Sequence, residues 1–250
     1  MRLDSLVGHL DELLRCKEIP DISDNGLQVE GDQEVEHVGT AVDASAHVVG
    51  KAIEAGCQFL IVHHGLFWGK AERVVGPHRA RMVALLESNL SVYAAHLPLD
   101  LHPDLGNNAL LLRILGLERE SGFGSSGGMD IGFRGRFETP RERGDLVDTL
   151  GRELGGRVDI YPFGPELIRT MGIVSGSGGS FVAEAVELGL DALLVGEWTY
   201  ASYHLAKDHG LNVLAAGHYA TETVGVRALG DHLNDQWGLE HTFLPEPIEK

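Results

Sequence analysis

Two stretches of this chain align with each other without a gap, and this internal repeat constrains the fold more than any other feature. Residues 51–64 (KAIEAGCQFLIVHH) share an alanine, a glutamate, a glycine, a leucine and a valine with residues 184–197 (EAVELGLDALLVGE). Residues 90–96 (LSVYAAH) match residues 211–218 (LNVLAAGH) with one inserted glycine. Because the two pairs follow each other in the same order, we infer an ancient internal duplication that produced two related lobes.

Short apolar runs alternate with stretches of helical periodicity along most of the chain, a pattern typical of α/β proteins. Residues 3–15 carry apolar side chains at helical spacing, and turn-forming residues follow them. After these we expect strands at 38–42, 59–62 and 92–95 and helices at 44–55, 77–89 and 108–115. The alternation resumes beyond residue 170. The pattern predicts mostly parallel sheets that are covered by helices on both faces.

The segment 121–130 (SGFGSSGGMD) is rich in glycine and serine, so we expect a linker there. We therefore predict a first α/β lobe over residues 1–125 and a second α/β lobe over residues 126–217. Residues 218–250 are expected to pack back on the first lobe. Residues 139–142 (TPRE) have the form of a capping box, which predicts a helix that starts there.

The composition excludes several classes of function. The 250 residues include 37 acidic and 20 basic ones, which gives a formal net charge of −17. This charge disfavours binding to nucleic acid and to anionic membranes. No apolar run approaches the roughly 18 residues of a membrane span, and the acidic N-terminal stretch is unlike a signal peptide. Two cysteines are too few for a disulfide framework, so we expect a cytoplasmic protein.

Thirteen histidines are the one unusual count, and several of them follow predicted strands. In open parallel sheets, ligands bind at that edge. Two adjacent histidines end the strand of the first repeat, and a His-x-x-x-acid motif follows a matching strand in each half of the chain. Spacing therefore selects six candidate metal ligands: His63, His64, His96, Asp100, His218 and Glu222.

Four imidazoles and two carboxylates suit divalent first-row metal ions, and the donor types do not distinguish Zn, Fe, Mn and Ni. Six ligands are too many for one tetrahedral ion with an open position, so we predict two divalent metal ions. In such sites the ions lie about 3.5–4 Å apart and lower the pKa of bound water. A single histidine after a strand is more often a core or capping residue. We expect that role for the other nine histidines, which are His9, His37, His47, His78, His102, His204, His209, His232 and His241.

Three further features have both a functional and a structural interpretation. Asp43 and Glu197 follow predicted strands, and each could be an outer acid, a general base or a cap. Glu197 is our candidate for a catalytic residue. The loop of serines and glycines at 175–180 could present N–H groups to an anion or form a simple tight turn. Phe67 and Trp68 could form a wall of the site or pack in the core.

These motifs resemble those of the GTP cyclohydrolase I type 2 homologues, the Nif-three-like dinuclear-metal family, in its short form. The resemblance covers nearly the whole chain. It implies that the six candidate ligands bind two metal ions between two related α/β lobes, and that the chain assembles as a ring-shaped homohexamer. The motifs are Asp24-Asn25-Gly26-Leu27-Gln28-Val29, Val42-Asp43, Ile61-Val62-His63-His64-Gly65, His96-Leu97-Pro98-Leu99-Asp100 and Gly217-His218-Tyr219-Ala220-Thr221-Glu222.

The family name implies that water opens the imidazole ring of GTP, with loss of C8 as formate. A hydroxide held by two metal ions could attack C8 while a histidine or Glu197 moves protons. No residue in the sequence can be assigned to the recognition of guanine. Three hypotheses therefore stay open: a dinuclear metal hydrolase of GTP cyclohydrolase type, a metal-dependent nucleotide phosphohydrolase, and a non-catalytic metal-binding hexameric protein.

Overall fold

The chain divides into two compact units in the computed structural model, which describes residues 1–248. Unit 1 consists of Met1–His102 together with the chain from Gly225 onward, and unit 2 is Pro103–Val224. The second crossing of the chain falls inside one helix, α9 (His218–Trp237). The lobe boundaries expected from the sequence, after residues 125 and 217, remain predictions.

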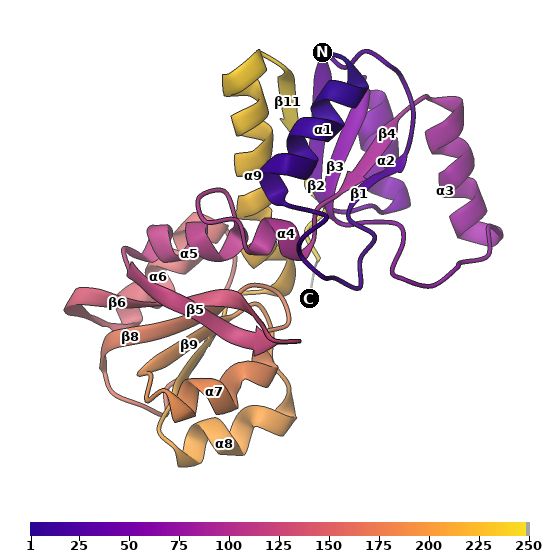
Figure 1. Cartoon of the computed structure of the whole chain (residues 1–250). Coiled ribbons are helices and arrows are strands. Elements are labelled where there is room, and N and C mark those ends of the chain that lie inside the picture. The colour runs from indigo at the N-terminus through magenta and orange to yellow at the C-terminus, as the bar shows by residue number, and fades with distance from the viewer. Residues whose placement is uncertain (249–250) are drawn as a thin grey trace. The chain divides into compact units, whose positions relative to one another are not determined.

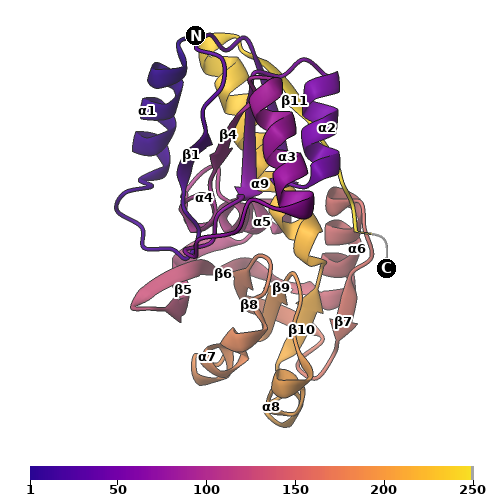
Figure 2. The same ribbon diagram turned by 90° about the vertical axis from the view of Figure 1, so that its right-hand side faces the viewer.

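A five-stranded sheet forms the centre of unit 1, with the strand order β1-β4-β3-β2-β11. Strand β1 is antiparallel to β4, and all other neighbours are parallel. Helices α2 and α3 cover one face of this sheet, and α1 and the later turns of α9 cover the other (Figures 1 and 2). The elements are α1 (Leu3–Leu14), β1 (Gly26–Val29), β2 (His37–Asp43), α2 (Ala46–Glu54), β3 (Phe59–His64), α3 (Gly76–Glu87), β4 (Ser91–Ala94), α4 (Leu97–Asp100) and β11 (Glu240–Phe243).

The side-chain pattern explains why the unit 1 helices form where they do. The leucines of α1 at positions 3, 6, 10 and 14 are all buried, as the helical spacing predicted. Ser45 caps α2, because its hydroxyl accepts a hydrogen bond from the N–H of Val48 at 3.0 Å. In β3, Leu60 and Val62 join the core under α2 and α3, while Phe59 and Ile61, which alternate with them, point to the opposite face.

A six-stranded sheet forms the centre of unit 2, with the strand order β5-β6-β8-β9-β10-β7. Strands β8, β9 and β10 are parallel, whereas the outer strands pair antiparallel. One core lies between this sheet and α5 and α6, and another between the sheet and α7 and α8. The elements are α5 (Asn107–Leu115), β5 (Glu118–Ser126), β6 (Met129–Glu142), α6 (Arg143–Leu154), β7 (Asp159–Tyr161), β8 (Leu167–Val174), α7 (Val182–Glu187), β9 (Ala192–Val195), α8 (Tyr203–Asp208) and β10 (Asn212–Ala215).

The duplication inferred from the sequence is confirmed by the topology. The strand order β1-β4-β3-β2 of unit 1 recurs as β7-β10-β9-β8 in unit 2, each with an antiparallel edge strand. Helices α2 and α7 end at the aligned residues Glu54 and Glu187. The aligned glycines Gly56 and Gly189 then have left-handed φ values of 74° and 63°. Both lobes are therefore mixed α/β structures of common origin, and the parallel pairing is more extensive in unit 1.

Two local predictions were wrong, and both concern the start of unit 2. Residues 121–130 do not form a linker, because β5 and β6 pair through them as an antiparallel hairpin. The turn is Gly127-Gly128, whose φ values of 59° and 84° suit a two-residue hairpin turn. The segment 139–142 is not a helix start either, since Arg141 and Glu142 still pair with β8 and α6 begins at Arg143.

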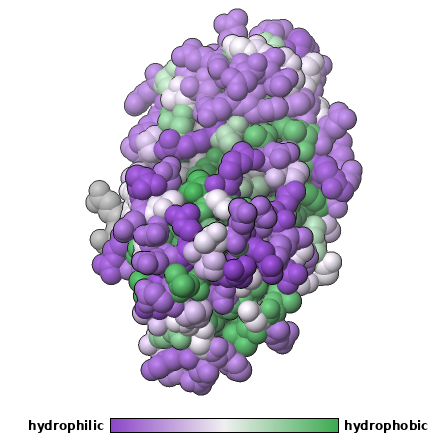
Figure 3. Space-filling view, turned by 90° about the vertical axis from the view of Figure 1, so that its left-hand side faces the viewer, coloured by the Kyte–Doolittle hydropathy of each residue, from purple (hydrophilic) through white to green (hydrophobic). Residues whose placement is uncertain are grey.

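No helix among residues 1–248 is long and apolar enough to cross a membrane. Hydrophilic side chains cover most of the face drawn in Figure 3, with apolar side chains between them.

Candidate metal centre

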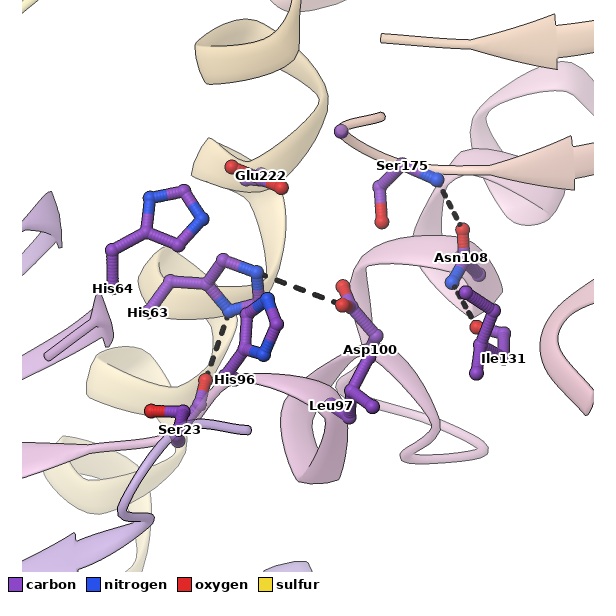
Figure 4. Close-up of polar contacts among 12 residues, drawn as sticks. Ser23, His63, His64, His96, Leu97, Asp100, Asn108, Ile131, Ser175 and Glu222 are labelled. Atoms are coloured by element: carbon purple, nitrogen blue, oxygen red, sulfur yellow. Dashed lines mark hydrogen bonds and ion pairs between the residues drawn. The ribbon is translucent and has the colours of Figure 1, made fainter. Parts of the chain in front are cut away.

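Four of the six predicted ligands come together in unit 1, at the carboxyl ends of two neighbouring parallel strands. His63 and His64 end β3, and His96 and Asp100 bracket the short helix α4 that follows β4. One ring nitrogen of each of the three histidines lies within 4.8 Å of the others. The Nε2 atom of His63 is 3.6 Å from a carboxylate oxygen of Asp100. A dashed line marks this contact in Figure 4. His63 and Asp100 are buried.

The residue after the histidine pair must be glycine. A Cβ atom on Gly65 would lie 2.6 Å from the Cβ of Ala94 and 2.5 Å from the side chain of Gln28. The side-chain oxygen of Gln28 also accepts a hydrogen bond from the N–H of Leu66 at 2.6 Å. The chain therefore passes closely against β4 as it leaves His64, which keeps the histidine pair beside His96.

The loop after α1 holds His96 through Asp21, a residue whose role the sequence analysis missed. The carboxylate of Asp21 accepts hydrogen bonds from Nδ1 of His96 at 3.0 Å and from the N–H of Leu97 at 2.9 Å. Asn25 donates to the same carboxylate and accepts from the N–H of His96 at 2.8 Å. Burial opposes ionisation of Asp21, but its hydrogen bond with His96, the charge of His96 and the bonds from Asn25 and Leu97 lower its pKa to about 2.

Each histidine of this cluster uses Nδ1 for a hydrogen bond within unit 1. His63 donates to the carbonyl oxygen of Ala95 at 2.9 Å, and His64 donates to Asp43 at 2.8 Å. Because a carbonyl or carboxylate oxygen can only accept, the proton of the neutral imidazole must sit on Nδ1. Nε2 then carries the lone pair, which is the arrangement typical of metal-binding histidines. Asp43 thus has the position of an outer acid.

The other two predicted ligands form a second group in unit 2. His218 and Glu222 lie one turn apart at the start of α9, with 3.2 Å between Nε2 and a carboxylate oxygen. Nδ1 of His218 donates to Glu197 at 3.0 Å, and the hydroxyl of Ser177 donates to the same oxygen at 2.7 Å. Glu222 is buried and Glu197 is exposed. His218 therefore repeats the pattern of a histidine that is oriented by a carboxylate through Nδ1.

Electrostatic interactions in this second group favour a protonated His218 beside an ionised Glu197. The hydrogen bond and charge of Glu222 raise the pKa of His218 to about 9, against the opposing effect of burial, and Glu197 adds to the rise. Hydrogen bonds from His218 and Ser177 lower the pKa of Glu197. Glu197 is thus ionised at neutral pH, as a proton acceptor must be.

The loop at 175–180 packs against the same group. A Cβ atom on Gly176 would lie 2.3 Å from a carboxylate oxygen of Glu222, so only glycine fits there. The N–H of Ser175 donates to the side-chain oxygen of Asn108 at 2.8 Å, and the amide of Asn108 donates to the carbonyl of Ile131, as Figure 4 shows. This loop therefore packs closely against the carboxylate of Glu222.

Trp68 borders the unit 1 cluster rather than the core of the unit. Its ring centroid is 5.1 Å from that of His96 and 5.8 Å from that of His64, and its indole N–H donates to the carbonyl of Gly65. Phe67 packs instead against the core under α2 and α3. Two of the histidines expected to have structural roles contact threonines: His241 lies 2.8 Å from the hydroxyl of Thr40, and His37 lies 2.8 Å from that of Thr242.

The donor set of unit 1 fits a transition metal ion. Three imidazole nitrogens and one carboxylate oxygen match the ligand preferences of Zn, Fe, Mn and Ni, and four ligands satisfy a tetrahedral ion. The carboxylates that hold His64 and His96 are the outer partners that metal-ligating histidines need. The group in unit 2 offers one further imidazole and one further carboxylate.

Comparison with known proteins gives the ancestry of this arrangement. Residues 1–248 match the family model Duf34/NIF3, for NGG1p interacting factor 3. The chain belongs to the DUF34/NIF3 family. Family relatives named GTP cyclohydrolase 1 type 2 homolog include a Pyrococcus abyssi protein that is 42% identical over 99% of both chains. The Escherichia coli relative of the same name is 36% identical over 99% of both chains. The resemblance seen in the sequence is thereby confirmed.

A solved structure supports the same conclusion for the fold. The crystal structure of a protein from Thermus thermophilus covers all of this chain and all of its own, with 40% identity and a TM-score of 0.91. The mixed α/β fold with two sheets is therefore that of the DUF34/NIF3 family.

Proposed function

We propose that this chain is a dinuclear metal-dependent hydrolase of GTP cyclohydrolase I type 2 kind, with a nucleotide as its substrate. In this proposal His63, His64, His96, Asp100, His218 and Glu222 together bind two divalent metal ions. One observation carries the proposal: all four of these histidines donate through Nδ1 to a carbonyl or carboxylate oxygen, which leaves Nε2 for a metal. The name shared by the relatives supports the choice of substrate.

The proposed reaction opens the imidazole ring of guanine with one water molecule and releases C8 as formate with a second. Two bound dications would lower the pKa of water enough to supply hydroxide near neutral pH. Glu197 is the proposed proton acceptor, because its carboxylate is exposed, ionised and hydrogen-bonded to His218. Glu197 also holds the ring of His218 through Nδ1, which would leave Nε2 of His218 to bind a metal ion.

The reaction is tested by incubating the metal-loaded protein with GTP and measuring formate and phosphate. Formate supports the proposal. Phosphate alone contradicts it and supports a nucleotide phosphohydrolase, which the same donor set would also serve. Neither product in repeated trials contradicts both and supports a non-catalytic metal-binding protein.

The ligand set is tested by the variant His64→Ala, which should lose metal and activity together. His47→Ala is the matched control, because His47 is an exposed histidine on α2 of the same unit. Full metal occupancy in the His64 variant would overturn the assignment.

The proposal also includes the assembly and location of the chain. A homohexamer should give a mass in solution of six times 27.0 kDa by light scattering. A mass near that of one chain would contradict the hexamer. A cytoplasmic location agrees with the two free cysteines, Cys16 and Cys57.

A further inference from the structure

The segment after the histidine pair is basic, in contrast to the rest of this acidic chain. Residues 70–81 carry four Lys and Arg side chains and one carboxylate, Glu72, so their formal charge is 4 − 1 = +3. The whole chain has a net charge of −17. Half the cations of this segment lie in the loop before α3 and half lie in its first two turns; they are Lys70, Arg73, Arg79 and Arg81. Such a local reversal of charge favours an anionic ligand.

The described part of the chain offers these cations no carboxylate partner. Within residues 1–248, none of the four lies within ion-pair distance of an aspartate or glutamate, and Glu72 lies 4.0 Å from His78 instead. Exposed cations elsewhere do pair, as Arg152 does with Glu153 at 3.0 Å and Arg157 with Asp159 at 2.6 Å. The first turn of α3 holds no acidic side chain and no capping hydrogen bond that would offset the charge.

Two buried polar atoms of the same segment also have no hydrogen-bond partner in the described part of the chain. They are Nε of Arg81 and Nε2 of His78, whose side chain is only 10% exposed. Buried polar atoms without a partner are rare in folded proteins, because each costs free energy. The segment is therefore built with more donors than the fold itself satisfies.

Contacts within unit 1 hold this segment beside the histidine cluster. Trp68, just before it, packs its ring against His96 and His64. At its other end, Arg81 donates to the carbonyl oxygen of Ala44 at 2.8 Å. The N–H of Ala44 in turn donates to the carbonyl oxygen of His64 at 3.2 Å. The basic segment thus begins and ends against residues that surround His64.

We propose that residues 70–81 bind the phosphate chain of the ligand that enters the histidine cluster. Lys70, Arg73 and Arg79 are exposed and have no ion-pair partner among residues 1–248. Lys and Arg bind phosphate oxygens through charge-assisted hydrogen bonds. Arg81 is fixed on Ala44 and orders the segment. The ligand class is a polyphosphate ester. That the ester is a nucleotide rests on the proposed function.

Inorganic tripolyphosphate is the probe, and its binding to the full chain is measured by calorimetry. The variant Lys70→Ala/Arg73→Ala/Arg79→Ala should bind it at least about tenfold more weakly than the natural chain, because three charged contacts are lost. The matched control Arg152→Ala/Arg157→Ala/Lys207→Ala removes the same charge from exposed positions of unit 2 and should bind like the natural chain. Equal affinities of the two triple variants would overturn the proposal.

Two further measurements separate this proposal from the proposed function. Tripolyphosphate chelates divalent ions, so binding is compared with and without added metal, and the basic-segment variant should be the weaker binder in both. Guanosine, which has no phosphate, should bind both triple variants equally; weaker binding to the basic-segment variant would contradict a phosphate role. If GTP yields no formate but the tripolyphosphate difference persists, the hydrolase proposal fails while the phosphate site stands.

Discussion

Nδ1 of His64 lies 2.8 Å from a carboxylate oxygen of Asp43, across the parallel pairing of β3 with β2. The register of the sheet places the two residues opposite each other, so the backbone pairing itself fixes the contact. The bond determines which nitrogen of His64 is protonated and which way the ring faces. In the second repeat Glu197 occupies the position of His64, and there the carboxylate orients His218. At this aligned position the first lobe thus has the histidine of a carboxylate–histidine pair, and the second lobe has the carboxylate.

Replacement of Asp43 by asparagine should weaken metal binding by about 10- to 100-fold, because the outer carboxylate raises the basicity of a ligating histidine and holds its ring. Metal affinity is measured by competition with a chelator. Asp231→Asn is the matched control, since Asp231 makes the same kind of bond to His241 at 2.9 Å on an exposed surface. An Asp43→Asn protein with unchanged affinity would remove His64 from the ligand set.

Substitution of Gly176 by alanine should destabilise unit 2 and impair metal binding together. Its φ of 61° alone costs a side chain about 1–2 kcal/mol, and the new Cβ would also meet the carboxylate of Glu222 at 2.3 Å. Gly189→Ala separates the two effects, because Gly189 has a φ of 63° and open space around it. Urea unfolding should show a larger decrease in the free energy of unfolding for Gly176→Ala than for Gly189→Ala. Only Gly176→Ala should lose metal affinity. Identical behaviour of the two would show that Glu222 is not displaced.

Asp21→Asn should reduce stability at neutral pH and make it less sensitive to acid. The folded-state pKa of about 2 lies below the usual 3.8, so the ionised carboxylate stabilises the fold above pH 3.8 and stops doing so as the pH falls to about 2. The shift corresponds to about 2 kcal/mol. Thermal unfolding of metal-free protein between pH 2 and pH 7 tests this, with the exposed Asp32→Asn as control. If the stability of Asp21→Asn depends on pH in the same way as that of the natural chain, this prediction is wrong.

Much of the fold could be predicted because its signals are local. Apolar runs such as residues 59–62 are buried in the sheet, and the spacing of the leucines gave α1. The β5–β6 hairpin was mistaken for a linker because its composition is that of a linker. Its own local signal was Gly127-Gly128 between alternating residues, a typical hairpin turn.

The candidate site could be predicted where the strands themselves deliver the side chains. His63 and His64 end one buried strand and His96 follows its neighbour, so the order of these residues in the sequence predicted that they lie at one edge of the sheet. Asp21 could not be found in this way. It contacts His96 across 75 residues from an irregular loop, and such a contact leaves no periodic pattern in the sequence.

Metal uptake should release a proton from His218 at pH 7, and this release should disappear at alkaline pH. In the metal-free chain the interaction with Glu222 raises the pKa of His218 to about 9, above the usual 6.5. The protonated imidazole therefore stabilises the metal-free fold fully below pH 6.5, and this contribution is lost as the pH rises through about 9. A metal ion needs the neutral imidazole, so affinity should rise with pH up to that value. Calorimetry at pH 7 in two buffers of different ionisation enthalpy measures the number of protons released per metal-binding event. This number should be smaller by about one in the His218→Gln variant. It should also be smaller by about one for the natural chain at pH 10. If the number of released protons changes neither in the variant nor at pH 10, His218 is not a ligand that loses a proton when the metal binds.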